Sequence, residues 1–193
     1  MTLLLINPGL GNLGSIKAAL ELLNYQYSEI KHFDDTTDIE QFKSFILPGV
    51  GSFEYGMNQM KKKGLDKFII KLFNNKKTGL GICLGMQFLL ETSTESSGEL
   101  VRGLGLIKGH VIRLKASDGF VPNIGWNSTN FTKTIDSLHC IGKSFDYYYV
   151  HSYAPTEIDE ENIFCKFKHG ENEVISGIYK ENLYGIQFHP EKS

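Results

Sequence analysis

Short apolar runs alternate with segments of helical periodicity in the first half of the chain. The apolar runs predict four buried strands, at residues 3–6, 27–30, 44–47 and 80–82. Apolar residues three or four positions apart predict four helices, one bearing Ile16, Leu20 and Leu23, one ending near Met60, and two at residues 65–73 and 84–91. Strands that alternate with helices predict an α/β fold, in which helices cover both faces of a parallel sheet.

The pattern changes after about Ser93. Strand-like stretches separated by turns predict five further strands, at residues 107–114, 145–150, 163–168, 173–179 and 183–188. We interpret them as a mixed or antiparallel extension of the same sheet. The predicted fold is therefore α/β, an open mixed, mostly parallel sheet flanked by helices, with an antiparallel extension in the second half. Since the chain has no repeats or linkers, we expect one domain over residues 1–193.

Composition excludes several classes of function. A chain of 193 residues can bury roughly 70% of the surface that it exposes when unfolded, so it can form a sizeable core. A formal net charge of −2 gives no support for a nucleic-acid or membrane surface, and no apolar run approaches the roughly 20 residues of a membrane span. The opening MTLLLIN lacks the basic region of a signal peptide, so we expect a soluble, cytoplasmic protein.

Residues 79–88, GLGICLGMQF, join a predicted strand to a predicted helix and carry Cys83 at the join. In Gly81-Ile-Cys-Leu-Gly85 the cysteine stands between two glycines, the form of a nucleophile elbow, where a sharp turn exposes the nucleophile above the sheet. A helix beginning at Leu84 would point free N–H groups at the sulfur, which favours the reactive thiolate. A buried structural cysteine is the alternative, but the paired glycines favour a nucleophile.

A cysteine nucleophile requires a base and a group that orients the base. Among the six histidines, His189 has the strongest case, because the predicted strand ending at Phe188 delivers it to the carboxyl edge of the sheet. Cys83 is expected at the same edge. Pro190 stiffens the backbone, and Glu191 can accept the imidazole N–H. The pattern predicts a triad of Cys83, His189 and Glu191, although His-Pro-Glu taken alone also suits a surface turn.

Another glycine-rich segment, Pro48-Gly-Val-Gly51, ends the strand that we expect beside the nucleophile strand. Its glycines let backbone N–H groups approach a substrate closely, as an oxyanion hole requires. The loss of one such donor typically slows turnover by about 10²–10³-fold. A plain strand-ending turn is the alternative.

The glycines of NPGLGNLGSI indicate a competing function. Gly9, Gly11 and Gly14 match G-x-G-x-x-G between a predicted strand and a predicted helix, and Glu29 lies 20 residues beyond Gly9. This is the form of a dinucleotide-binding fingerprint, although glycines also serve tight turns that bind nothing. Because the alternating pattern ends after four strands, a second nucleotide-binding half is hard to place, and this hypothesis is the weaker one.

Together, GICLGMQ, PGVGSF and QFHPEKS closely resemble the class I, triad-type glutamine amidotransferases in order, in spacing and over almost the full chain. NPGLGNLGSI, VPNIGWN and YYYVHSY narrow the resemblance to the glutaminase subunits of imidazole glycerol phosphate synthase and their close relatives. The resemblance implies a flavodoxin-like core and a first glycine loop that lies near a synthase interface. The family pattern also leads us to expect one more helix after Ser193, so that this chain lacks the last helix of the domain.

The resemblance implies a role for individual residues. Cys83 would attack the carboxamide carbon of glutamine, and His189, oriented by Glu191, would accept the thiol proton and donate one to the departing ammonia. Water activated by His189 would then hydrolyse the thioester. The backbone N–H groups of Val50 and Leu84 would hold the oxyanion, and no metal or organic cofactor is implied. The residues implied to contact glutamine are Gly51, Gln87, Ser152 and Tyr153.

The resemblance also implies a partner. Ammonia would pass through an apolar route to a (βα)₈-barrel cyclase subunit in a heterodimer, where it is used to make imidazole glycerol phosphate in histidine biosynthesis. Trp126, the only tryptophan, is the expected interface anchor, with a core aromatic as its alternative. Closure of the oxyanion loop would depend on the partner, so the isolated chain is expected to be nearly idle. The other expected interface residues are Asn12, Pro122 and Ile124.

Two segments depart from the family pattern. Asn7-Pro8-Gly9 stands where the family usually has Asp-Tyr-Gly, and Asn123-Ile124 stands where histidine-pathway members commonly have His and Met. Both positions face the partner in the family, so a paralogous synthase that amidates a surface sugar is an open alternative. Another cysteine hydrolase, such as a peptidase, is less favoured because it leaves Gln87 and the segment His151-Ser-Tyr unexplained.

Overall fold

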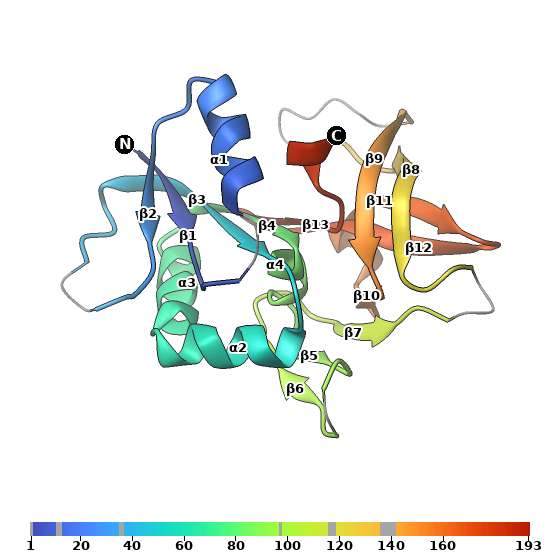
Figure 1. Ribbon diagram of the computed structural model, residues 1–193, viewed down its shortest axis with the longest axis horizontal. Coiled ribbons are helices and arrows are strands. Elements are labelled where there is room, and N and C mark those ends of the chain that lie inside the picture. Colours follow the sequence, from blue (N-terminus) through green and yellow to red (C-terminus); the bar gives the residue numbers. More distant parts are fainter. Residues whose placement is uncertain (1, 11–12, 35–36, 97, 116–118, 136–141) are drawn as a thin grey trace.

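A computed structural model describes six stretches of the chain, residues 2–10, 13–34, 37–96, 98–115, 119–135 and 142–193. These residues form two sheets, one of nine strands and one of four (Figure 1). The larger sheet has a parallel half and an antiparallel half that share strand β13 (Leu183–Ile186). The mixed α/β fold predicted from the sequence is confirmed.

The parallel half has the strand order of a flavodoxin-like fold. Its strands, in spatial order, are β2 (Tyr27–Ile30), β1 (Thr2–Ile6), β3 (Phe42–Gly49), β4 (Thr78–Cys83) and β13. All four pairings among them are parallel. Since parallel strands end at a common edge, β3, β4 and β13 bring residues 48–51, Cys83 and His189 to one end of the sheet.

The antiparallel half continues the sheet beyond β13, as predicted for the second half of the chain. Its strands, in spatial order, are β12 (Asn172–Lys180), β11 (Ile163–His169), β8 (Asn123–Phe131) and β9 (Ser144–His151). The sequence pattern did not predict β8, whose nine residues include only three large apolar side chains. Within the larger sheet, parallel and antiparallel pairings among the described strands are equal in number, four of each.

One prediction is wrong: the strand predicted at residues 107–114 does not extend the larger sheet. It corresponds to β7 (His110–Arg113) in the smaller sheet, whose other strands are β10 (Tyr153–Thr156), β5 (Thr92–Ser93) and β6 (Val101–Arg102). Strand β7 lies in the smaller sheet because it pairs with β10. Strand β10 begins after a single residue that follows β9, so the chain passes from the larger sheet to the smaller one at Ser152.

Helices cover both faces of the parallel half (Figure 1). Helix α1 (Leu13–Leu22) buries Ile16 and Leu20 on one face, whereas α2 (Phe53–Lys62) and α3 (Leu65–Asn74) bury their apolar sides on the other. Leu23, predicted on the buried side of α1, is 68% exposed because the helix ends one residue earlier and the chain turns at Asn24. Among the described helices, none is long and apolar enough to cross a membrane.

The helix predicted at residues 84–91 is a single turn, α4 (Leu84–Gln87). Neighbouring backbone takes the carbonyl groups that a longer helix would use. Phe88 O accepts a hydrogen bond from Leu104 N at 2.8 Å, and Leu90 O accepts one from Gly105 N at 3.0 Å. The residues after α4 are therefore fixed against the loop that follows β6.

Gly85→Ala should destabilise the fold, because the added Cβ would lie 1.8 Å from Leu47 O, a backbone atom of β3. Overpacking a core typically costs about 1–3 kcal/mol, and backbone yields less than a side chain, so we expect the free energy of unfolding to fall by at least about 2 kcal/mol in urea denaturation. Gly98→Ala is the matched control, since its Cβ would meet nothing within 4 Å. Equal unfolding midpoints for the two variants would contradict this account.

Candidate active site

Cys83 occupies the sharp turn between β4 and α4. Its backbone angles, φ +55° and ψ −114°, are rare for a residue with a side chain and reverse the chain direction within one residue. The flanking glycines make the turn sterically possible, because a Cβ at Gly81 would lie 2.7 Å from Gly85 O. The sharp strand-to-helix turn predicted at Cys83 is confirmed, but the side chain is buried in the structure, at 5% exposure, and is not exposed above the sheet.

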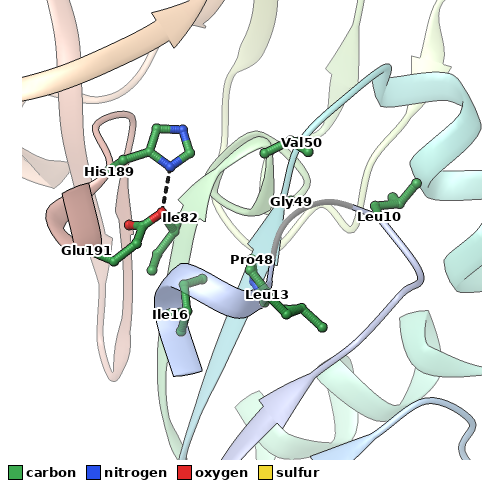
Figure 2. Close-up of a pocket in the computed structure, with 9 residues that line it drawn as sticks. All are labelled: Leu10, Leu13, Ile16, Pro48, Gly49, Val50, Ile82, His189 and Glu191. Carbon is green, nitrogen blue, oxygen red and sulfur yellow. Dashed lines mark hydrogen bonds and ion pairs between the residues drawn. The ribbon is translucent and has the colours of Figure 1, made fainter. Parts of the chain in front are cut away.

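His189 follows β13 and reaches the same sheet edge as Cys83. Its Nδ1 lies 2.8 Å from Oε1 of Glu191, in the short helix η3 (Pro190–Lys192), and both side chains are almost completely buried (Figure 2). Ser193 Oγ donates to His189 O at 2.7 Å and secures this turn. Because an ionised carboxylate only accepts hydrogen bonds, Nδ1 carries the proton and Nε2 is left to exchange protons with other groups.

Two opposing effects set the pKa of His189. Burial lowers it, but interactions with Cys83 and then with Glu191 outweigh burial and raise the pKa to about 9. Nε2 is buried and has no hydrogen-bond partner among the described residues. The ring is therefore protonated at neutral pH and carries an N–H at Nε2 that can donate a proton.

A cavity of about 160 Å³ opens beside Cys83. The sequence predictions converge here, because the wall contains every residue predicted to contact glutamine and both positions predicted to hold the oxyanion. These wall residues are Val50, Gly51, Leu84, Gln87, Ser152 and Tyr153.

Hydrogen bonds fix the polar wall of this cavity. Gln87 Nε2 donates to Tyr153 O and to Gln187 Oε1, each at 3.0 Å, and Gln187 Nε2 donates to Cys83 Sγ at 3.6 Å. The sequence analysis missed Gln187. A signal was available, because Gln187 stands two residues before His189 in an otherwise apolar run, and alternate residues of an extended chain share a face.

Glu95 also lines the cavity, and the sequence analysis missed it as well. Its Oε2 accepts the backbone N–H of Phe53 at 3.0 Å, and burial raises the pKa of its carboxyl group above the usual value. It lies in a loop after β5, where no periodicity marks it. Glu95 thus contributes an acidic side chain to the cavity wall, and a carboxylate there is opposite in charge to the α-ammonium group of a free amino acid.

A second, water-sized cavity of about 10 Å³ lies next to the His189–Glu191 pair. Leu10, Leu13 and Ile16, from the loop and helix after β1, line this cavity together with the pair (Figure 2). Their apolar side chains shield the imidazole and the carboxylate from solvent on this side, which strengthens the electrostatic interaction between them.

The described residues of the first glycine loop and its surroundings do not support a dinucleotide site. Glu29, the carboxylate that a ribose would need, already accepts hydrogen bonds from Asn7 Nδ2 at 2.6 Å and from Lys17 Nζ at 2.5 Å. Gly9 serves a turn with φ +84°, Gly14 lies within α1, and Gly11 lies outside the described residues. The dinucleotide hypothesis is therefore wrong, and the glycines that the structure describes serve the passage from β1 to α1.

The residues predicted at a partner interface lie on or beside β8. Ile124 and Trp126 are each 60% exposed, and Pro122, which follows a cis peptide bond, is also exposed. Trp126 is thus a surface residue and not a core aromatic, with its ring edge-on to Tyr148 at a centroid distance of 6.2 Å. Asn12 lies outside the described residues.

The other cysteines and the acidic side chains suggest no further chemistry. Cys165 is buried in the core, where desolvation raises the pKa of its thiol to about 12, and Cys140 lies outside the described residues. Within the described stretches, no three His, Cys, Asp or Glu side chains are arranged to hold a metal ion.

The chain is similar in sequence, over almost its whole length, to curated proteins. Imidazole glycerol phosphate synthase subunit HisH of Bacillus velezensis is 38% identical over 193 residues, which cover 97% of this chain and 88% of that protein. Imidazole glycerol phosphate synthase subunit HisH 2 of Methanococcus maripaludis is 38% identical over 194 residues, which cover 98% and 91% of the two chains.

Solved structures agree on the fold, and a family model fixes the family. A crystal structure of a glutamine amidotransferase matches with a TM-score of 0.75 at 16% identity, covering 99% of this chain and 91% of the other. PurLQS from Thermotoga maritima matches with a TM-score of 0.74 at 20% identity, covering 98% and 87%. Residues 4–193 match the family model described as glutamine amidotransferase class-I. The chain belongs to the class I glutamine amidotransferase family.

Proposed function

We propose that this chain is the glutaminase subunit of imidazole glycerol phosphate synthase and supplies ammonia for histidine biosynthesis. One observation carries the proposal: the strained turn at Cys83 meets the His189–Glu191 pair and a cavity whose wall contains the predicted glutamine contacts. The choice of synthase is supported by relatives that are 38% identical over nearly the whole chain and carry that name.

The reaction follows from the charges at the site. The Cys83 thiolate attacks the carboxamide carbon of glutamine, and the carbonyl π electrons move to oxygen to give a tetrahedral oxyanion. Protonated His189 donates its Nε2 proton to the amide nitrogen as the C–N bond breaks, so that ammonia leaves and a thioester forms. The neutral imidazole then takes a proton from water, which attacks the thioester and releases glutamate.

The oxyanion is held by backbone N–H groups of Val50 and Leu84 in this proposal. Both residues line the cavity beside Cys83, and Leu84 is the first residue of α4, where N–H groups have no partner within the helix. Val50 follows Gly49, which pairs with Cys83 across β3 and β4. Donors from two adjacent strand ends thus flank the sulfur, as acyl-transfer catalysis requires.

Glu95 supplies the recognition of a free amino acid. A partly buried carboxylate in the wall of the cavity attracts the α-ammonium group of glutamine, whereas a peptide-bound glutamine has a neutral amide at that position. Gln87, Ser152 and Tyr153 line the same cavity as Glu95 and Cys83. This distribution favours a free amino-acid substrate over the substrates of a peptidase.

The partner in this proposal is a (βα)₈-barrel subunit that receives the ammonia. Free ammonia is protonated in water and loses its nucleophilicity, so the two active sites must communicate through a dry interface. The exposed face of β8, with Ile124 and Trp126, offers large apolar side chains of the kind that interfaces favour. Lys192, next to the catalytic pair, lies over the ring of Tyr148 on the neighbouring strand at 5.7 Å from its centroid.

Glutamate release from glutamine should require Cys83 and the partner. We expect Cys83→Ala to lower turnover by at least about 10⁴-fold, as the loss of a triad nucleophile does elsewhere, and Cys165→Ala to keep it. Activity should rise when the barrel subunit, loaded with its ribotide ligand, is added. If adding this barrel subunit leaves the rate of glutamate release unchanged, the barrel of the histidine pathway is not the partner. If Cys83→Ala still releases glutamate, Cys83 is not the nucleophile.

The imidazole of His189 should titrate near pH 9, as measured by NMR of its ring protons. Glu191→Gln keeps the hydrogen bond but removes the charge, so the midpoint should fall by at least about one pH unit. Because the folded pKa lies above the unfolded value of about 6.5, the bound proton contributes full stability below pH 6.5, and this contribution is lost as pH rises through 9. Glu161→Gln, an exposed control, should not shift the midpoint; equal midpoints near 6.5 in all three proteins would refute the ion pair.

Glu95→Gln should raise the KM for glutamine about 10-fold or more with a smaller change in kcat. The variant retains an oxygen to accept the Phe53 N–H, so the main loss is the charge that meets the α-ammonium group, and hydrogen bonds to charged groups contribute about 1.5–3 kcal/mol. Steady-state glutaminase kinetics measure the effect, with Glu99→Gln, an exposed residue nearby, as control. An unchanged KM would remove Glu95 from the binding site.

A further inference from the structure

His151 lies at the corner where the two sheets meet. It is the last residue of β9 and pairs with Asn123, the first residue of β8. His151 and the next two residues, Ser152 and Tyr153, line the glutamine cavity as the chain passes into the smaller sheet. The conformation of this corner therefore determines one wall of the cavity.

Both ring nitrogens of His151 are engaged. Nδ1 lies 2.9 Å from Tyr153 O, and Nε2 lies 3.1 Å from Asn123 Nδ2. A carbonyl group only accepts, so Nδ1 carries the proton and Nε2 accepts from the Asn123 amide. Asn127 Nδ2 donates to Asn123 Oδ1 at 3.3 Å, which fixes the direction of that amide. The donor and the acceptor of each of these three hydrogen bonds are thus defined.

The surroundings keep the His151 ring neutral and immobile. The residue is 7% exposed and packs against the rings of Tyr149 and Phe167, with centroid distances of 5.7 and 5.8 Å. Burial lowers its pKa to about 4. The ring is therefore neutral near neutral pH, and both of its nitrogens are engaged in hydrogen bonds.

Tyr153 O connects His151 to the nucleophile. This carbonyl oxygen accepts hydrogen bonds from His151 Nδ1 and from Gln87 Nε2. Gln87 also donates to Gln187, whose Nε2 donates to Cys83 Sγ. An unbroken series of hydrogen bonds thus joins the inner face of β8 to the sulfur. On the same strand, Asn123 is buried, whereas the side chains of Ile124 and Trp126 are exposed on the opposite face.

We propose that His151 is a positioning residue of the glutaminase reaction, held by Asn123 and holding Tyr153 O, which in turn orients Gln87 and, through Gln187, the Cys83 sulfur. The proposal rests on the glutaminase function proposed above. It also gives the Asn at position 123 a role, since its amide donates to His151 directly beneath the exposed face of β8. A shift of β8 would be transmitted to the wall of the cavity.

A matched pair of variants tests the bond to Tyr153. His151→Asn keeps an N–H donor near the position of Nδ1, whereas His151→Gln places its amide near Nε2 and loses that donor. In the complex with the barrel subunit, we expect His151→Gln to raise the KM for glutamine about 10-fold and His151→Asn to stay within about 3-fold of wild type. Ser128→Ala is the control, because it loses hydrogen bonds to Ser144 and Asp146 in the same β8–β9 hairpin and should not change KM.

A second readout needs no partner. The rate at which iodoacetamide alkylates Cys83, and the glutamine concentration that halves this rate, report on the pocket of the isolated chain. We expect the half-protecting concentration to rise about 10-fold in His151→Gln, about 3-fold in Asn123→Ala and not at all in Ser128→Ala. Melting temperatures are measured in parallel for every variant.

The outcomes separate the two proposals. Lower melting temperatures with unchanged KM and unchanged protection in both His151→Gln and Asn123→Ala would show a merely structural role and overturn the positioning proposal alone. Equal effects of His151→Asn and His151→Gln on KM would also overturn it, since only one of them keeps the donor. If the wild type shows no turnover and glutamine does not protect its Cys83, the glutaminase function and this inference are both overturned.

Discussion

The close approach of the β4–α4 turn to β3 is the constraint on which the rest of the site depends. Cys83 can adopt its strained backbone only because Gly85 lies against Leu47 O without a side chain between them. Strain of this kind costs about 1–3 kcal/mol and persists only where the surroundings enforce it. Here β3 and β13 pair with β4 on both sides, and the turn cannot relax without breaking the centre of the sheet.

Parallel pairing also assembles the remaining chemistry. Because β3, β4 and β13 end at one edge, the segments proposed as oxyanion loop, nucleophile and base meet there although they are far apart in sequence. The antiparallel half contributes the substrate wall instead. Its strand β9 leads directly into β10, and the change of sheet at Ser152 brings Tyr153 to Gln87. One half of the molecule thus provides the reacting groups and the other half shapes the cavity.

Much of this arrangement could be predicted from the sequence, because it depends on local rules. Strand alternation and paired glycines identify the sheet and the turn at Cys83, and the strand before His189 places the base. Glu95 and His151 escaped because their surroundings arise from contacts between distant residues: a loop carries Glu95 to the cavity, and His151 is held by Asn123, 28 positions earlier in the chain. The length of α4 escaped for the same reason, since a distant loop takes the carbonyl groups that would have extended it.

The covalent intermediate is the most direct test of the account. The complex with the barrel subunit, mixed with glutamine and quenched in acid within its first turnovers, should yield a peptide containing Cys83 that has gained the mass of a γ-glutamyl group. Hydroxylamine should remove this γ-glutamyl group, as expected of a thioester, and peptides containing Cys165 should not carry it. Steady glutamate release with no such adduct on Cys83, or with an adduct on another residue, would contradict the central claim that this cysteine is the nucleophile.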